Sequence, residues 1–268
     1  MVKRGAKPKP FDCPEQYFWY LVGLIATDGC LSGDRRHIDV TLKEEDHLAR
    51  IRNTIGLRCG VTKKLNGAGQ TAYHMQIGSR ILYDRLLMIG LTSKKSLTLG
   101  ALQVPSHRFT DFLRGVIDGD GNIRRWKHPT NGREQWSLRI FSASKPFMHW
   151  ISETSSRLWN VEGKIHEELP ENKKRHTKYI LKYGKLAAKV ILGKCYYKRA
   201  FALERKRAIA DRCVCSDVGW SQSKTVVDRS SWKGWTYKHT YGETVNHSII
   251  RENFQRKAGV VERFTRVT

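Results

Sequence analysis

The chain has 268 residues, 40% of them hydrophobic, which is enough for one large domain or two small ones with a proper core. Its 49 Lys and Arg against 25 Asp and Glu give a formal charge of +24, for which nucleic acid is the usual counterpart. The sequence has no apolar run of transmembrane length, no signal-peptide segment and no lipidation motif, so neither a membrane protein nor a secreted protein is expected.

The hydrophobic periodicity predicts a first half over residues 11–99, preceded by a basic arm at 1–10. A helix over 14–25, with Asp12 or Cys13 at its cap, opens this half. Alternating polar and apolar residues predict a strand at 37–42. Two further strand candidates at 61–65 and 71–77 are joined by the turn-rich residues 66–69, and helices are predicted at 46–55 and 81–88. Residues 100–109, which include Pro105, form the predicted linker.

A second half over residues 110–210 has the same order of elements. The pattern predicts helices at 110–117, 145–159 and 185–210, and strands at 123–126, 136–141, 164–168 and 177–182. The extension at 211–268 is rich in tryptophan and tyrosine. Its segment 242–258 either forms a small helical DNA-contact element, or the extension packs against the preceding halves.

The six cysteines form no CxxC pair and have no zinc-ligand spacing to a downstream histidine. Scattered cysteines in a chain without a secretion signal indicate reduced thiols. We therefore expect the protein in the cytoplasm, or in an organellar matrix if an organelle encodes it.

An internal repeat joins the two halves. The segment LVGLIATDG at 21–29 recurs as LRGVIDGDG at 113–121, so Asp28 and Asp120 correspond at an offset of 92 residues. Glycine in mid-helix costs up to about 1 kcal/mol relative to alanine, and close helix–helix contact through Gly23 and Gly115 would justify that cost.

The repeated aspartates indicate a metal site. A carboxylate at a helix C-terminus opposes the helix dipole, and two such carboxylates brought together repel each other, whereas a dication relieves both effects. One Asp-Gly pair is more often a simple turn, but two copies in the same register favour metal ligands. A calcium loop of the EF-hand type beginning at Asp118 fails, because Ile123 and Pro129 stand at required Gly and Glu positions.

The repeated motif resembles that of the LAGLIDADG homing endonucleases in their single-chain form with two motifs. The resemblance covers about residues 16–207 and includes IGLTSKKS at 89–96, SAS at 142–144 and LERK at 203–206. The first motif departs from the usual pattern at Ala26 and Thr27. The resemblance implies an α+β fold, in which two pseudo-symmetric αββαββα halves carry antiparallel saddle-shaped sheets and the motif helices pack together centrally in a monomer.

The resemblance also implies a set of site residues. Asp28 and Asp120 carry over as catalytic metal ligands, and the backbone carbonyls of Thr27 or Gly119 complete the coordination of Mg²⁺, for which Mn²⁺ or Ca²⁺ would substitute in binding. The family places one lysine in each half near the attacking water.

Lys95 is the best match for this lysine in the first half, with Lys94 as competitor. In the second half the choice is Lys198, with Lys194 and Lys206 as competitors.

Strand side chains on the DNA-facing side of each sheet would read about two helical turns of double-stranded DNA. On the strand at 71–77 this set is either Tyr73 with Met75 or His74 with Gln76. The family has a polar residue, often glutamine, at the end of a strand in each half, and this position falls on Lys43 and Ser142. The expected DNA-binding residues are Arg35, His37, Asp39, Lys43, Lys64, Tyr73, Gln76, Arg124, Trp126, Gln135, Ser137, Arg139, Lys178 and Lys182.

The resemblance therefore implies a site-specific endonuclease that hydrolyses phosphodiesters in both DNA strands with a divalent metal and leaves short 3′ overhangs, as in intron homing. Two alternatives remain open. One is an RNA maturase, an intron-splicing cofactor on the same fold. The other is a DNA-binding regulator that does not cut, against which the two intact aspartates argue.

Overall fold

The computed structural model describes residues 13–65, 69–170 and 176–216, all within the first of two units, Met1–Ser216 and Asp217–Thr268. The predicted basic arm and the segment 242–258 lie outside the described residues, as does the rest of the extension from residue 217. No helix in the described part of the chain is both long and apolar enough to cross a membrane.

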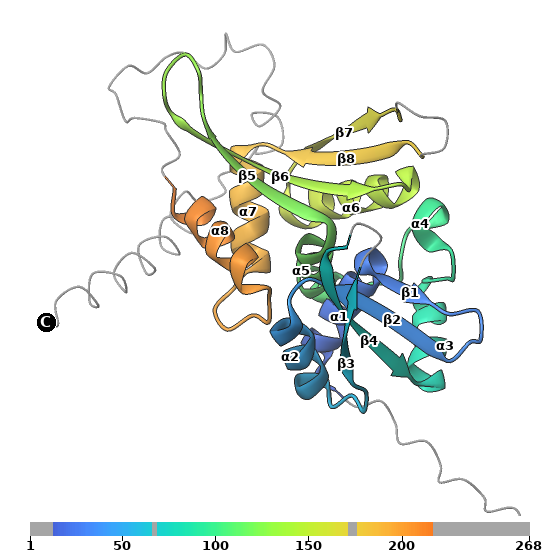
Figure 1. Ribbon diagram of the computed structural model, residues 1–268. Helices are drawn as coiled ribbons and strands as arrows, with labels where there is room; N and C mark the ends of the chain where they lie inside the picture. Colours follow the sequence, from blue (N-terminus) through green and yellow to red (C-terminus); the bar gives the residue numbers. More distant parts are fainter. Residues whose placement is uncertain (1–12, 66–68, 171–175, 217–268) are drawn as a thin grey trace, which may run out of the picture. The chain divides into compact units, whose positions relative to one another are not determined.

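The first half is built on an antiparallel sheet with strand order β1-β2-β4-β3 (Figure 1). Its elements are α1 (Glu15–Asp28), β1 (Gly29–Leu31), β2 (His37–Leu42), α2 (Glu45–Ile55), β3 (Val61–Leu65), β4 (Thr71–Gly78), α3 (Arg80–Ile89) and α4 (Lys95–Thr98). Residues in β2 alternate between buried and half-buried because successive side chains point to opposite faces. Ile38, Val40 and Leu42 form the buried face, toward α1 and α3.

The second half has the same topology, with strand order β5-β6-β8-β7. Its elements are η1 (Ser106–Arg108), α5 (Phe109–Asp120), β5 (Gly121–Lys127), β6 (Glu134–Ser142), α6 (Lys145–Trp159), β7 (Gly163–Glu168), β8 (Lys178–Tyr183), α7 (Lys185–Cys195) and α8 (Glu204–Cys215). Two antiparallel sheets of matching order in one α+β chain confirm the expected fold class.

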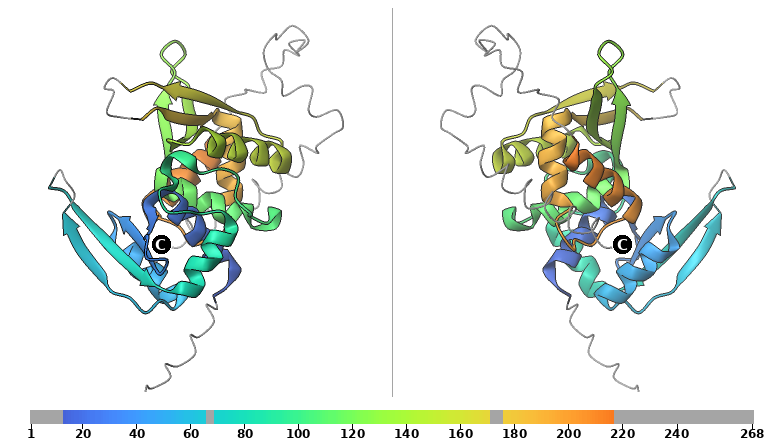
Figure 2. Two further views of the ribbon diagram at one scale, coloured as in Figure 1. Left: turned by 90° about the vertical axis from the view of Figure 1, so that its right-hand side faces the viewer. Right: turned by 90° about the vertical axis from the view of Figure 1, so that its left-hand side faces the viewer.

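The two motif helices α1 and α5 pack directly against each other (Figures 1 and 2). A Cβ atom added to Gly23 would lie 2.0 Å from the carbonyl oxygen of Phe112, and one added to Gly115 would lie 2.2 Å from that of Tyr20. Both atoms that would be struck belong to the backbone and cannot rotate away. The predicted close contact through the two mid-helix glycines is therefore confirmed.

The predicted helix at 185–210 is wrong, because the chain forms two helices, α7 and α8, with a loop between them. Arg199 in this loop has a positive φ of 63°, which no helix accommodates. The buried guanidinium of Arg114 on α5 donates to the carbonyl oxygens of Cys195 at 2.9 Å and Phe201 at 2.7 Å. This long-range contact satisfies backbone acceptors at the helix break, and no local pattern encodes it.

The boundaries of α1 also differ from the prediction. The N-cap residue is Pro14, which has no side chain that could cap the helix, and not the predicted Cys13; the other predicted cap, Asp12, lies outside the described residues. The helix continues past Ile25 to Asp28, and the three-residue strand β1 follows at once. At three residues, β1 is too short for an alternating pattern to be visible in the sequence, so it was not predicted.

Candidate active site and nucleic-acid face

Each motif helix ends at its aspartate and passes directly into a strand. Gly29 and Gly121, the next residues, have extended backbones, not the left-handed conformation of a usual helix-ending glycine. Glycine is required here for space, because a Cβ on Gly29 would lie 2.6 Å from Ile25 Cα and one on Gly121 would lie 2.5 Å from the carbonyl oxygen of Ile117. This tight turn places both aspartates at the edge where helices and strands meet.

The packing of α1 on α5 brings the two aspartates into one site. A Cβ on Gly119 would lie 2.8 Å from Asp28 Oδ2, so the Asp28 carboxylate lies against the backbone beside Asp120. Burial, followed by the negative charge of Asp120, raises the pKa of Asp28 to about 6. Burial also raises the pKa of Asp120. The site therefore disfavours two uncompensated negative charges, which is the electrostatic condition expected of a cation-binding pair.

Both carboxylates keep oxygens available for a ligand. Within the described part of the chain, the carboxylates of Asp28 and Asp120 form no hydrogen bond and no ion pair. The described part of the chain contains no group of three or more His, Cys, Asp or Glu side chains that could hold a metal. One or two carboxylates, with water and substrate phosphate oxygens as further ligands, are the usual way in which proteins bind Mg²⁺, so the donor set fits that ion.

The predicted carbonyl ligands lie at the same place. The carbonyl oxygen of Gly119 already accepts a hydrogen bond from Lys206 Nζ at 3.2 Å, which leaves one lone pair for an ion. The side chain of Thr27 donates back to the carbonyl of Leu24 at 3.0 Å, within its own helix. The roles of Gly119 and Thr27 as ligands stay predictions.

Two buried lysines flank the aspartates, one from each half. Lys95, in α4, donates through Nζ to the carbonyl oxygen of Gly29. Lys206, in α8, donates to the carbonyl oxygens of Gly121 and Ile117, each at 2.6 Å. Each lysine thus binds the glycine that follows an aspartate. Burial lowers the pKa of Lys95, and it lowers that of Lys206 to about 8.

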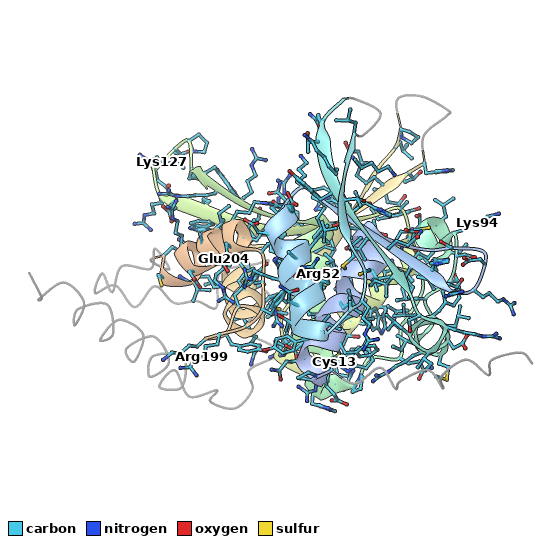
Figure 3. All side chains as sticks on the ribbon, turned by 60° about the horizontal axis from the view of Figure 1, so that its bottom comes forward. Cys13, Arg52, Lys94, Lys127, Arg199 and Glu204 are labelled. Carbon is cyan, nitrogen blue, oxygen red and sulfur yellow. The ribbon has the colours of Figure 1, made fainter. Side chains whose placement is uncertain are left out.

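The predicted second-half lysine, Lys198, does not lie in this arrangement. Lys198 is exposed in the loop between α7 and α8, next to Arg199, which is labelled at the surface in Figure 3. Lys206 and Lys95, but not Lys198, are the lysines whose charges lower the pKa of Asp120. Lys206 is therefore the second-half counterpart of Lys95. The LERK segment, which fits the family pattern, was the sequence signal for it.

Asp118 is a residue of the site whose role the sequence did not suggest. Its buried carboxylate accepts hydrogen bonds from Tyr20 Oη at 2.8 Å, from Tyr196 Oη at 2.6 Å and from the backbone N–H of Leu203 at 2.8 Å. Leu203 is the N-cap residue of α8, three residues before Lys206. Asp118 therefore fixes the start of the helix that carries the lysine, and the repeat has Ala26 at the corresponding position.

In the second sheet, the predicted DNA-contact residues share one face. This outer face is the side of a sheet opposite its buried hydrophobic residues. Cross-strand pairs place Arg124 opposite Ser137, Trp126 opposite Gln135, and Lys182 opposite Arg139, and Lys178 follows by alternation. The prediction for Ser137 is wrong, because its side chain is fully buried in the central strand β6 and cannot contact a base in this conformation.

The first sheet has a corresponding outer face, which includes all but one of the DNA-contact residues predicted on its strands. Pairing places Asp39 opposite Gln76, and His37 and Lys64 share that side. Tyr73 pairs with Leu42 on the buried face, so His74 and Gln76 are the outward-facing pair of the two predicted alternatives on this strand. Tyr73 and Gln76 lie three residues apart on one strand and must point to opposite faces.

Arg35 and Lys43 are exposed residues that flank β2. Ser142, the predicted strand-end position of the second half, accepts from the backbone N–H of Ser144 at 3.0 Å. DNA contact by these and the other outer-face residues stays a prediction.

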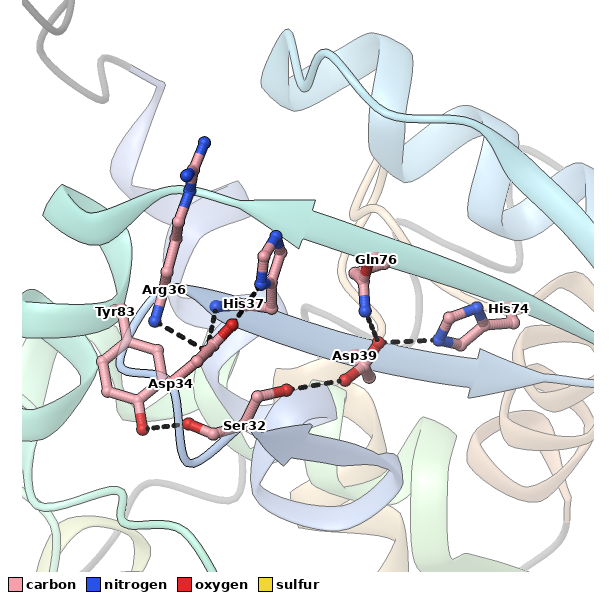
Figure 4. A network of polar contacts seen from close by, with 8 residues as sticks. All are labelled: Ser32, Asp34, Arg36, His37, Asp39, His74, Gln76 and Tyr83. Carbon is pink, nitrogen blue, oxygen red and sulfur yellow. Dashed lines mark hydrogen bonds and ion pairs between the residues drawn. The ribbon is translucent and has the colours of Figure 1, made fainter.

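Polar contacts fix several side chains on the outer face of the first sheet (Figure 4). Asp39 accepts hydrogen bonds from Ser32, His74 and Gln76. Asp34 pairs with His37 Nδ1 and accepts from the backbone N–H groups of Arg36 and His37. These hydrogen bonds, led by that of the His37 side chain, lower the pKa of Asp34 to about 2.

The sequence matches no protein-family model and no curated protein. Among solved structures, the homing endonuclease I-WcaI bound to its DNA recognition sequence has a TM-score of 0.53 at 12% identity, covering 77% of this chain and 95% of that one. Full-length DUF199/WhiA from Thermatoga maritima has a TM-score of 0.49 at 16% identity, covering 95% and 72%. I-DmoI in complex with DNA and Mn has a TM-score of 0.40 at 16% identity, covering 62% and 89%.

Proposed function

We propose that this protein, which has the fold of the LAGLIDADG homing endonuclease I-WcaI, is a divalent-metal-dependent endonuclease that cuts both strands of a specific DNA site. One observation carries the proposal. Asp28 and Asp120, from two halves of equal topology, meet at adjacent helix ends, and a buried lysine accompanies each of them. A purely architectural role would not require two desolvated carboxylates without hydrogen-bond partners in the described part of the chain.

The residues of the site divide the work of phosphodiester hydrolysis. A bound Mg²⁺ ion would supply a Lewis acid and an activated water. Asp28 and Asp120 would hold it, each near the phosphate of one strand. Lys95 and Lys206 place a positive charge beside each aspartate, where negative charge develops on the phosphate. At neutral pH, a pKa of about 8 keeps Lys206 mostly protonated.

Binding to DNA would rest on the charge of the chain and the outer faces of the sheets. The formal charge of +24 favours association with phosphates, and the exposed or half-buried residues of the outer faces include arginine, lysine and glutamine, which read base edges in the major groove. The internal pseudo-dimer supplies both half-site surfaces from one chain, so we propose that a monomer acts.

A cleavage selection tests this function. The full chain is incubated with Mg²⁺ or Mn²⁺ and a library of circular DNA that carries a randomised insert, and linearised molecules are sequenced. We expect linear products that share one target of about two helical turns, with short 3′ overhangs. Sequence-specific binding without any strand cleavage in either metal would instead identify a DNA-binding regulator.

A further inference from the structure

We propose that Asp39 orients Gln76 and His74 so that the first sheet reads, on one DNA strand, a base that carries an exocyclic amino group, adenine or cytosine. This inference rests on the proposed DNA-cleaving function and names part of its specificity. Adenine N6 and cytosine N4 are donors in the major groove, whereas guanine and thymine present acceptors at the equivalent position.

The orienting contacts converge on one carboxylate of the outer face (Figure 4). Asp39 Oδ1 accepts from His74 Nε2 at 2.7 Å and from Gln76 Nε2 at 3.1 Å, and Oδ2 accepts from Ser32 Oγ at 3.1 Å. The Asp39 side chain is only 24% exposed. Its contacts tie together strands β2 and β4 and the turn after β1.

A carboxylate accepts but cannot donate hydrogen bonds, and this decides which way its partners face. Gln76 must turn its amide nitrogen toward Asp39, because the reversed amide would set two oxygens against each other. The amide oxygen of Gln76 is therefore directed away from the carboxylate as an acceptor. His74 likewise uses its Nε2 hydrogen on Asp39, and its neutral form would keep the Nδ1 lone pair as an acceptor.

The arrangement is held in place before DNA arrives. Tyr83 in α3 donates to the backbone carbonyl of Ser32 at 2.7 Å, which fixes the residue that binds Asp39 Oδ2. Asp39 itself has little capacity left for a base, since three donors already occupy most of the acceptor sites of its two oxygens. A negative side chain on a surface that binds phosphates weakens that binding. Fixing the amide direction of Gln76 would offset this cost.

Binding selection from a randomised duplex library tests the inference. The parent protein is the full chain with Asp28→Asn and Asp120→Asn, so that bound DNA stays uncut. We expect one half-site position at which adenine or cytosine is favoured by roughly fivefold or more over guanine or thymine. Fivefold is about the lower end of the discrimination that one good base contact provides. Adding Asp39→Asn should remove or reverse that preference, because asparagine also donates and permits the reversed amide of Gln76.

Two further variants make the outcome decisive. Gln76→Ala, which leaves Asp39 and His74 in contact, should lose the preference at the same position. Gln135→Ala, on the outer face of the other sheet, should change preference only in the opposite half-site. If the parent selects a defined target but Asp39→Asn and Gln76→Ala both keep the adenine or cytosine preference, the orienting role is wrong. If the parent selects no target at all, the proposed function fails first, and this inference falls with it.

Discussion

Lys206 donates a hydrogen bond of 2.6 Å from Nζ to the carbonyl oxygen of Gly121. The contact joins α8, near the end of the described chain, to the residue directly after the second metal-binding candidate. Lys95 makes the same contact with Gly29 in the first half. The local sequences around the two lysines differ, so the pseudo-symmetry of the site is a property of the folded chain, not of the repeat alone.

Replacing Lys206 by methionine should slow cleavage of one strand by about 100-fold, because a positive charge beside one scissile phosphate is lost. Nicked circular DNA should therefore accumulate before linear DNA in a plasmid assay at saturating enzyme. Lys198→Met is the matched control, since that lysine is exposed, and it should cleave both strands at the parent rate. The reverse pattern, with Lys198→Met impaired and Lys206→Met normal, would reassign the second-half lysine.

Replacing Gly23 by alanine should destabilise the protein by about 1–3 kcal/mol or more, because the new Cβ meets the backbone oxygen of Phe112 at 2.0 Å. Gly60→Ala, at a position with no atom within 4 Å of the new Cβ, should change stability by no more than about 0.5 kcal/mol. Thermal or denaturant unfolding measures both. A melting temperature unchanged or raised in Gly23→Ala would show that the motif helices do not meet.

Acid should weaken the fold through His47. Burial lowers the pKa of His47 from 6.5 to about 4, so the unfolded chain binds more protons between those values. The stability contributed by neutral His47 is complete above pH 6.5 and declines as the pH falls toward 4. The difference in unfolding free energy between wild type and His47→Gln should therefore shrink over this window.

Denaturant titrations at several pH values measure that difference. The exposed Asn53 on the same helix provides a comparison that does not titrate, and Asn53→Gln should show no such trend. A difference for His47→Gln that stays constant from pH 7 to pH 4 would mean that His47 is not held neutral by burial.

Affinity for DNA should fall steeply with salt because bound phosphates release counterions. If about six phosphates are contacted, raising salt from 50 to 200 mM should weaken binding by about 1,000-fold. Fluorescence anisotropy with a labelled duplex gives the slope. A flat response would mean that the basic surface of the chain faces something other than DNA.

Where short-range periodicity determines structure, the sequence was sufficient. Strands β2 and β3 begin and end at the predicted residues. In β2, alternation over six residues identifies the strand without tertiary information. The repeat likewise located Gly23, Gly115 and both aspartates, since one spacing occurs twice.

Features set by distant contacts were not predictable in the same way. The break between α7 and α8 is bound by Arg114, more than 80 residues earlier in the chain. Ser137 lies on the predicted face by alternation, yet its side chain is fully buried in the central strand β6. Lys198 and Lys206 are both basic residues near the end of the second half, and only the course of the loop decides which one reaches Gly121.

The most direct test of a shared two-aspartate site is cleavage of the selected target in a supercoiled plasmid by Asp28→Asn and Asp120→Asn. Each change keeps the shape of the side chain while removing its negative charge. With Mg²⁺, neither variant should produce linear DNA, while each should bind the target within about threefold of wild type, because affinity rests on phosphate contacts elsewhere. Linear product at the wild-type rate from either variant would contradict the account.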